Sequence, residues 1–410
     1  MALPRVVITG VGAVTPIGLT ASEFWQNLVA GKPGTGFITR FDASAYPARL
    51  AAEVKGFDAL KYMDLKTVER NGRFTHYAIA STLMALEMAK LDVRQEKTDR
   101  VGVVIATAGE VYLIGDYAEV LKAKGPRRMD PLFINRISAH MGPVQVAKFI
   151  GARGPNSSVN SACAGGSDAI GTALNRIRLG HADVILAGGA DTIIAPVAIA
   201  SMALVGALSK DPTPERAPRP FDRERNGFVT GEGAGMLVLE TYEHARGRGA
   251  TILAELAGAG WSNDAKDDTA PDAEGQALAM KQALADAGMR PDEIDYVNAH
   301  GTGTRLNDSA ETAAIKLVLG ERAYKVLVSS NKSMIGHLAS GAGAVEAVAT
   351  VLTIMNGTVP PTINYRTPDP ECDLDYVPNV ARKHDVRAAL SNSFGLGGQN
   401  CSILIKRFER

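Results

Sequence analysis

Cysteine is scarce in this chain of 410 residues, which contains three, at positions 163, 372 and 401. Their number is odd and their spacing is wide, so the sequence offers neither a disulfide framework nor a zinc cluster. We therefore expect a reducing, cytoplasmic environment.

Net charge is also lacking, because 44 basic residues balance 44 acidic ones. A neutral chain gives no reason to expect nucleic acid or an anionic membrane as the main partner.

The sequence also lacks an apolar run near the roughly 20 residues that span a bilayer, and its first residues lack the pattern of a signal peptide. Aromatic residues make up only 6%, whereas glycines number 42. This composition indicates close packing through Ala, Val and Gly, which is typical of layered α/β proteins. A chain of this length is too long for one simple core, so we expect two domains or a duplicated one.

Short apolar segments alternate with helix-length amphipathic segments, as expected for βαβ units around a mostly parallel sheet. The predicted strands are residues 5–9, 101–105, 183–187, 236–239, 251–256, 296–298 and 326–329. The predicted helices are residues 73–90, 165–179 and 274–287, with a further helix opening at 336–344.

The helices at 165–179 and 336–344 are both rich in small residues, which suggests two similar halves whose strand-to-helix turns face one another. We divide these halves as residues 1–240 and 241–410. Residues 209–227 contain four prolines and many charges, so we expect a surface loop that covers a site or braces a dimer rather than a core element.

Residues 10–15 look like the start of a dinucleotide-binding fingerprint, but the third glycine is replaced by Thr15. No acidic residue ends a following strand at the usual distance. We therefore expect no nucleotide here, and interpret these glycines as part of a loop that passes close to neighbouring backbone.

Cys163 lies between the β-branched and polar segment 157–160 and a helix rich in small residues. Free N–H groups at a helix N-terminus favour thiolate and can lower a cysteine pKa from ~8.5 to about 3.5–7.5. The same N–H groups can hold an oxyanion. A buried structural cysteine is the alternative, and this segment alone does not separate the two.

His300 and His337 lie in glycine-rich segments, and each follows a predicted strand. Both should project at the carboxyl edge of the sheet, where α/β proteins bind ligands. Neither has a partner at metal-ligand spacing, so we expect no zinc. One thiol and two imidazoles suit acyl transfer with carbon–carbon bond formation, in which two N–H donors polarise a thioester carbonyl.

Motifs along essentially the whole chain resemble those of the β-ketoacyl-acyl-carrier-protein synthases of the elongating type, within the thiolase superfamily. They comprise the opening residues 6–12 and residues 219–222, 227–229, 298–304, 329–343, 360–364 and 391–398. The resemblance implies an α/β, five-layered αβαβα thiolase-like fold made of two pseudo-repeated halves. It also implies decarboxylative condensation of a cysteine-bound acyl group with malonyl-acyl carrier protein in fatty-acid elongation.

The resemblance implies acyl carrier protein as the partner and no further cofactor, because the phosphopantetheine arrives on the carrier. A homodimer is expected, with a heterodimer as the open alternative. For the pathway, the alternative is a specialised polyketide or polyene route with a chain-length-factor-like partner.

The resemblance further implies that Cys163 is the nucleophile, that His300 and His337 act on the malonyl thioester, and that Lys332 tunes the histidines. Backbone N–H groups of Cys163 and Phe394 would form the oxyanion hole, with Phe394 as a gate to the acyl pocket. Substrate-binding roles are implied for Thr302, Thr304, Thr269, Phe133, Gly109, Ala162, Met202 and Phe228. Supporting roles are implied for Glu346 and Asp308.

The carrier protein is acidic, so its docking surface should be locally basic. Lys122, Lys124, Arg127 and Arg128 form the one notable basic cluster, and Lys66 with Arg70 lies where the family also contacts its carrier. A solvated loop is the alternative interpretation.

Several positions depart from the family pattern. Gly109 and Glu110 stand where a bulky aliphatic residue usually lines the acyl tunnel, so we expect its wall to be opened or lined differently. Other departures are Arg305 for proline, Asn331 for threonine, Gly206 for arginine, and Gln399. None removes a catalytic group, and together they leave the pathway and the acyl length open.

Other thiolase-fold proteins are less consistent with these residues. A degradative thiolase would carry a second active-site cysteine in place of one histidine, and an initiating type III synthase would carry Asn where His337 stands. A chain-length-factor-like subunit would lack the nucleophile at Cys163.

Overall fold

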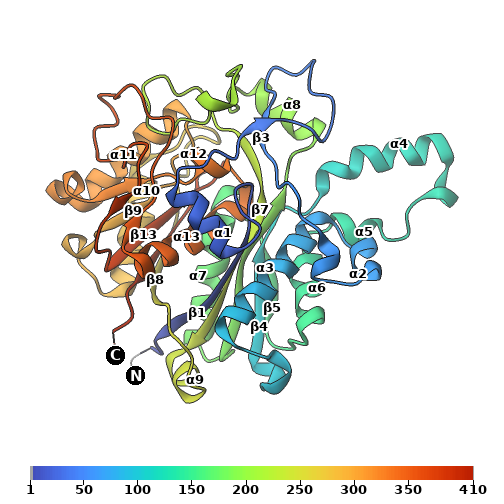
Figure 1. Ribbon diagram of the computed structural model, residues 1–410, viewed down its shortest axis with the longest axis horizontal. Helices are drawn as coiled ribbons and strands as arrows, with labels where there is room; N and C mark the ends of the chain where they lie inside the picture. The colour runs from blue at the N-terminus through green and yellow to red at the C-terminus, as the bar shows by residue number, and fades with distance from the viewer. Residues whose placement is uncertain (1–2, 410) are drawn as a thin grey trace.

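The computed structural model describes residues 3–409, and a 12-stranded sheet runs through its centre in the order β10-β9-β13-β14-β8-β1-β7-β6-β4-β5 (Figure 1). These strands are β1 (Val6–Val14), β4 (Val101–Ala106), β5 (Asn156–Val159), β6 (Val184–Thr192), β7 (Thr230–Thr241), β8 (Ala254–Asn263), β9 (Tyr296–Asn298), β10 (Leu327–Ser329), β13 (Ala388–Phe394) and β14 (Gln399–Lys406). β3 (Leu50–Ala52) pairs with β7 and also with β2 (Gly36–Phe37), and β11 (Thr358–Val359) pairs with β12 (Arg382–Lys383).

The strand order repeats when it is followed inward from each end of this path. From one end, the strands of the first half come in the order β5-β4-β6-β7-β1, and from the other end those of the second half come in the order β10-β9-β13-β14-β8. When the strands of each half are numbered along the chain, both orders are third, second, fourth, fifth, first. The two first strands, β1 and β8, meet antiparallel in the middle, with Val7 opposite Glu255. This repetition confirms the predicted pseudo-repeat. The boundary between residues 240 and 241 stays a prediction.

Helices and sheet halves alternate in five layers (Figure 1). Between the two halves lie α7 (Gly165–Arg178) and α13 (Ala342–Asn356), which contact strands of both. The outer face of the first half is covered by α3 (Arg73–Ala89) and α6 (Met141–Ile150). The outer face of the second half is covered by α10 (Ala273–Ala287) and α11 (Arg305–Leu319). The expected αβαβα architecture is confirmed.

The remaining helices are short and lie around these layers. They are α1 (Ala21–Val29), α2 (Leu65–Arg70), α4 (Ile114–Lys124), α5 (Phe133–Ile137), α8 (Pro196–Leu204), α9 (Tyr242–Gly247) and α12 (Lys332–Ile335).

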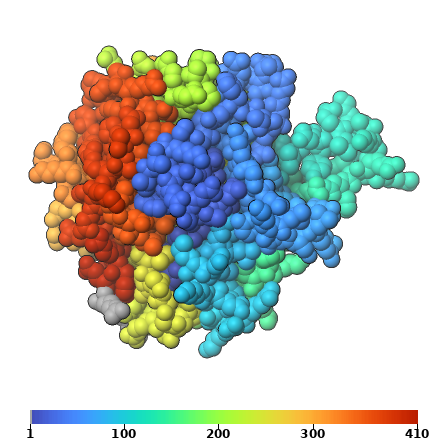
Figure 2. Space-filling view, in the orientation of Figure 1, coloured from blue at the N-terminus to red at the C-terminus, as the bar shows by residue number. Residues whose placement is uncertain are grey.

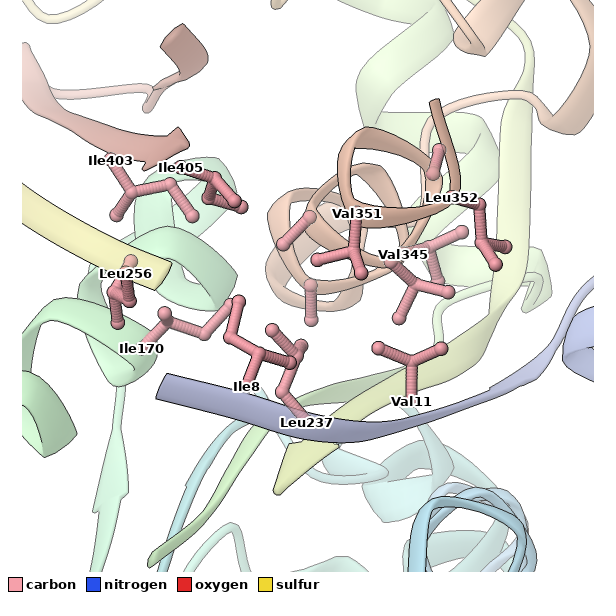
Figure 3. Packing of buried hydrophobic residues seen from close by; sticks show 14 of the residues in the cluster. Ile8, Val11, Ile170, Leu237, Leu256, Val345, Val351, Leu352, Ile403 and Ile405 are labelled. Carbon is pink, nitrogen blue, oxygen red and sulfur yellow. The ribbon is translucent and has the colours of Figure 1, made fainter. Parts of the chain in front are cut away.

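The central helix α13 is part of the largest core cluster, where Val345 and Val351 lie with Ile8, Val11 and Leu237 of the sheet (Figure 3). Residues Ala339–Asn356 are long and apolar enough to cross a membrane, with a mean hydropathy of 1.2 over 18 residues, although the sequence suggested no such run. Within the protein, 83% of this segment is buried. Its apolar character is therefore explained by its place between two sheet layers.

The first strand differs from its prediction. Residues 10–15 were expected to form a loop, but β1 continues through Gly10 and Gly12 to Val14. A Cβ at Gly12 would overlap with the carbonyl oxygen of Ser81 in α3, and one at Gly10 with that of Ala85. The glycines thus allow close backbone approach, as expected, but they do so between a helix and a strand.

Several further element boundaries differ. β7 begins at Thr230 rather than at residue 236, and β6 continues to Thr192 rather than ending at residue 187. β8 begins at Ala254 rather than at residue 251 and continues to Asn263. α13 begins at Ala342 rather than within 336–341, because Gly336 and Ala339 have φ values of 70° and 46°, which no α-helix accommodates.

The proline-rich segment 209–227 is less peripheral than expected. Phe221 is fully buried and stacks on Tyr376 with 4.0 Å between ring centroids. Arg225 is 2% exposed and forms an ion pair with Asp369. The many charged residues of this segment led us to expect a surface loop. They do not require exposure to solvent, because the charge of the buried Arg225 is balanced by Asp369 inside the protein.

Residues 111–136, here called the arm, project from the body of the molecule and carry α4 (Figures 1 and 2). α4 buries none of its residues. Several large apolar side chains of the arm are 42–55% exposed, namely Val111, Ile114, Leu121 and Ile134. Such a surface is typical of a segment that is covered in an assembly.

Candidate active site

The ends of several strands bring together the residues that the sequence analysis predicted to be catalytic. β9 pairs in parallel with both β10 and β13, so the loops after these three strands leave the sheet at one edge. His300 follows β9, His337 follows β10, and Phe394 ends β13. From the other half, Cys163 follows β5.

These four residues line one cavity of about 560 Å³. Four of the predicted substrate-binding residues line it as well, namely Thr302, Thr304, Thr269 and Phe228. Within residues 3–409, the cavity lining does not include the other four, Phe133, Gly109, Ala162 and Met202.

These four residues lie elsewhere. Phe133 packs edge-on against Tyr117 in the arm at 4.7 Å, and Met202 packs against the small cluster that contains Ile199. Ala162 directly precedes Cys163, and Gly109 follows β4. Their roles in substrate binding stay predictions.

Cys163 sits in a 3-10 turn, Ala162–Ala164, that leads directly into α7. Ala162 has a φ of 49°, an uncommon backbone conformation for a residue with a side chain and one that clusters at functional sites. The turn holds the thiol between the end of a strand and the start of a helix, as expected.

The pKa of Cys163 differs from its prediction. Burial raises the pKa of the thiol above its ordinary value, while the N–H of Leu396 and the positive charge of Lys332 oppose that rise. Because burial has the larger effect, the expectation of a lowered pKa is wrong. A helix N-terminus favours thiolate only as far as desolvation of the charge permits.

The two histidines stand close together between two aromatic rings. The ring centroids of His300 and His337 are 5.3 Å apart, with an angle of 84° between their planes. Phe394 lies 5.7 Å from His300, and Phe228 lies 5.1 Å from His337. In this setting His300 is 2% exposed and His337 is 3% exposed.

Lys332 approaches His300 from inside the protein. It is 0% exposed, its Nζ lies 3.3 Å from Nδ1 of His300, and it forms an ion pair with the buried Glu346. An ammonium group can only donate, so Nδ1 of His300 accepts and the proton of the neutral ring is on Nε2. Lys332 thereby fixes which nitrogen of His300 can donate.

Both histidines are neutral at physiological pH. Burial lowers the pKa of His300 and that of His337 well below 6.5, and the charge of Lys332 lowers both further. Two hydrogen bonds fix the main chain of His337. The N–H of His337 donates to the carbonyl of Val229, just before β7, at 2.7 Å, and the carbonyl of His337 accepts from the N–H of Gly231 in β7 at 2.8 Å. The site therefore presents two neutral imidazoles on a fixed backbone.

Two carboxylates of α11 hold the loop of His300. Glu311 accepts hydrogen bonds from the N–H groups of His300 and Gly301 at 2.8 and 2.7 Å, and burial raises its pKa to about 7. Asp308 accepts from the N–H of Gly303 at 3.2 Å. Sequence reasoning named Asp308 but missed Glu311, because an acidic residue on an amphipathic helix usually faces solvent.

Asp191, at the end of β6, was also missed. It is fully buried, its carboxylate accepts from the N–H of Ser340 at 3.0 Å, and burial raises its pKa to about 7. Ser340 lies three residues after His337 and belongs to the other half of the chain. No sequence signal could have found this bond, because it joins residues 149 positions apart.

Glu110 serves the N-terminus of α3. Its carboxylate accepts from the N–H of Arg73 at 2.8 Å and from Oγ1 of Thr192 at 2.9 Å. The N-cap residue of α3, Gly72, has no side chain, so Glu110 supplies the capping oxygen from another segment. A buried carboxylate thus stands where the family usually has a bulky aliphatic residue. The effect of this difference on the wall of the acyl tunnel stays a prediction.

The residues predicted to dock the carrier protein are exposed and lie outside the cavity lining. Arg127 and Arg128 belong to the arm, and Lys66 and Arg70 belong to α2. Arg136 at the base of the arm donates a hydrogen bond to the carbonyl of Glu69, so α2 and the arm are in contact.

Comparison with known families identifies two matching models. The model described as "Beta-ketoacyl synthase, N-terminal domain" matches residues 4–245. The model described as "Beta-ketoacyl synthase, C-terminal domain" matches residues 253–366. A curated protein of Synechocystis sp., 3-oxoacyl-[acyl-carrier-protein] synthase 2, is 46% identical over 409 residues, which cover 99% of this chain and 98% of that protein.

Solved structures give the same result. One, titled "The ishigamide ketosynthase/chain length factor", matches with a TM-score of 0.94 and 39% identity, and each chain is covered completely. Another is a type II polyketide-synthase acyl-carrier protein in complex with its ketosynthase, which matches with a TM-score of 0.88 and 36% identity, again over 100% of both chains.

Proposed function

The chain belongs to the β-ketoacyl synthase family, and on that basis we propose that it condenses an enzyme-bound acyl group with malonyl-acyl carrier protein in fatty-acid elongation. The products are β-ketoacyl-acyl carrier protein and CO2. The observation that supports this most strongly is one cavity lined by a cysteine thiol and two neutral imidazoles. Neutral rings can donate N–H hydrogen bonds to a developing oxyanion.

In the first step, the sulfur of Cys163 attacks the thioester carbonyl of the acyl group. The bond between that carbonyl and the pantetheine sulfur breaks, and the proton of the Cys163 thiol goes to the departing pantetheine thiolate. Backbone N–H groups of Cys163 and Phe394 stabilise the oxyanion formed on the way. Phe394 sits at the end of β13 beside a glycine-rich loop, which suits its proposed role as a gate.

In the second step, the malonyl thioester binds and its carbon–carboxylate bond breaks. The electron pair of that bond passes into an enolate, and CO2 leaves. His300 and His337 donate N–H groups to the enolate oxygen, and Lys332 supports this role because its bond to Nδ1 keeps the proton of His300 on Nε2. One such donor is worth roughly 2.7–4 kcal/mol in a comparable oxyanion site.

In the third step, the enolate carbon attacks the acyl carbonyl on Cys163. A carbon–carbon bond forms, the carbon–sulfur bond to Cys163 breaks, and the thiolate takes up a proton. Thr302, Thr304 and Thr269 line the cavity and would hydrogen-bond the pantetheine arm that carries the product. The phosphopantetheine is delivered by the carrier protein as part of the substrate.

For the assembly, we propose a homodimer in which the exposed apolar residues of the arm are covered.

A second candidate function is that of a ketosynthase in a polyketide or polyene pathway with a chain-length-factor-like partner. This candidate is favoured by the similarity to the ishigamide ketosynthase/chain length factor. The mass of the purified protein in solution separates a homodimer from a chain that needs a different partner.

All three cysteines are free, which suits a reducing compartment such as the cytoplasm.

The proposed reaction is tested by mixing the protein with acyl- and malonyl-loaded carrier protein and measuring the mass of the carrier products. A β-ketoacyl product two carbons longer than the acyl substrate is expected, with one CO2 released per product. Cys163→Ala should form no product. Turnover that persists in Cys163→Ala would contradict the proposal, and acyl substrates of graded length and unsaturation would separate the two candidate pathways.

A further inference from the structure

The cavity that leads to Cys163 is unevenly charged. Of all the lysines and arginines in residues 3–409, only Arg305 lines it. Three aspartates also line it, namely Asp264, Asp267 and Asp268. Any anion that enters the cavity therefore meets a single positive side chain.

Arg305 is exposed, and its guanidinium forms no ion pair with another residue of the described part of the chain. Its main chain, in contrast, is fixed. Arg225 lies behind it, donating to the carbonyls of Thr304 and Arg305 at 3.2 and 3.0 Å. The charge of Arg225 is balanced by its ion pairs with Asp369 and Asp308. Arg305 is thus a fixed residue with an uncommitted positive charge.

The surroundings of Arg305 mark the mouth of the cavity. Three apolar side chains that line the cavity are also strongly exposed, namely Val205 at 73%, Leu306 at 61% and Leu396 at 68%. Apolar neighbours lower the local dielectric constant, so a charge pair formed at this mouth is stronger than one in open water.

The negative charge of the aspartates restricts where an anion can bind in this cavity. Asp267 accepts hydrogen bonds from Thr269 and from the N–H of Ala270, and these bonds lower its pKa, so it stays negatively charged. A phosphate would be repelled by Asp267 and attracted by Arg305. Arg305 is also next in sequence to Thr304, whose hydroxyl lies 3.0 Å from that of Thr302.

We propose that Arg305 binds the phosphate of the phosphopantetheine thioester, as a residue that determines specificity for phosphate-bearing substrates. This rests on the proposed function, in which a pantetheine thioester reaches Cys163 past Thr302 and Thr304. The planar guanidinium can engage two phosphate oxygens, whereas a lysine offers a point charge. A carboxylate on the carrier protein is the competing anion, and the experiment separates it from the phosphate.

The test compares two substrates that differ only in the phosphate, malonyl-4′-phosphopantetheine and malonyl-pantetheine. Condensation is measured with full-length protein whose Cys163 has been acylated beforehand. Wild type should show a kcat/KM about fivefold higher for the phosphate-bearing substrate, mainly through KM, as expected for one partly exposed ion pair. Arg305→Gln should lose this preference, and Arg305→Lys should retain part of it.

Lys266→Gln is the matched control, because it removes a positive charge from the Asp264–Thr269 segment that is already paired with Asp272. This variant should keep the phosphate preference. The proposal is overturned if wild type shows no preference, if Arg305→Gln keeps it, or if Arg305→Gln impairs only malonyl-acyl carrier protein, which would point to a carboxylate of the carrier. If acylated wild type condenses none of these substrates, the proposed function itself fails.

Discussion

At Cys163, two effects of opposite sign act on the thiol. The helix start at Gly165, the N–H of Leu396 and the charge of Lys332 favour the thiolate, while burial disfavours it. Burial prevails, so the thiol is mostly protonated at physiological pH. The acyl transfer proposed for Cys163 would then depend on a small thiolate fraction or on loss of the proton during attack.

This balance predicts how alkylation of Cys163 by iodoacetamide depends on pH. Because its pKa is raised, the thiolate fraction should grow about tenfold per pH unit through neutral pH and reach no plateau below about pH 9. The measurement is the rate of modification of the peptide that contains Cys163. The other two cysteines are buried and should react slowly. A plateau near pH 6–7 would instead support the lowered pKa that a helix terminus alone implies.

Sequence reasoning could predict that Cys163, His300 and His337 share one site, because they lie in distinctive glycine-rich segments, and all three line one cavity. It could not give the sign of the pKa shift at Cys163, since desolvation depends on segments far away in the chain. For the same reason it missed Asp191, whose bond to Ser340 links the two halves.

Among the elements, β1 and α3 show how glycines in a strand position a helix. The carbonyl of Ser81 occupies the space in which Gly12 would carry a side chain, so α3 packs directly on the strand backbone. α3 is also capped by Glu110, which hydrogen-bonds Thr192 at the end of β6. The glycine pattern alone could not distinguish this packing from a loop, because both need close backbone approach.

Gly12→Ala should therefore destabilise the protein, because the added methyl group forces α3 away from β1. A loss of roughly 1–3 kcal/mol in the free energy of unfolding is expected, as for other overpacked cores. Gly247→Ala is the matched control, since a Cβ at Gly247, the last residue of α9, meets no atom within 4 Å in the described structure. Urea unfolding measures both, and equal stability of the two variants would refute the packing argument.

For the whole molecule, the repeated strand order is what brings the proposed catalytic groups together. Cys163 follows the third strand of the first half, and His337 follows the third strand of the second half. The two predicted helices rich in small residues, at 165–179 and 336–344, indicated two similar halves. The antiparallel joining of β1 and β8, by contrast, could not be predicted, because only a few residues form it.

The arm and α2 place the basic residues proposed for carrier docking outside the cavity. Reversing Arg127 and Arg128 to Glu should raise KM for acyl-carrier substrates several-fold, because an acidic partner would then meet like charge. KM for small thioester mimics should not change. Steady-state kinetics with both substrate types measure this, and an equal effect on both would exclude a docking role.

The central claim is that Cys163 carries the acyl group while His300 and His337 drive decarboxylation. It is tested most directly by a single-turnover chase with His337→Ala, followed by mass spectrometry of the peptide that contains Cys163. With acyl-carrier protein alone, wild type and variant should both gain the acyl mass on this peptide. After malonyl-carrier protein is added, wild type should lose that mass as β-ketoacyl product forms, whereas the variant should keep it. An acyl group that never appears on Cys163, or that is cleared equally fast in the variant, would contradict the account.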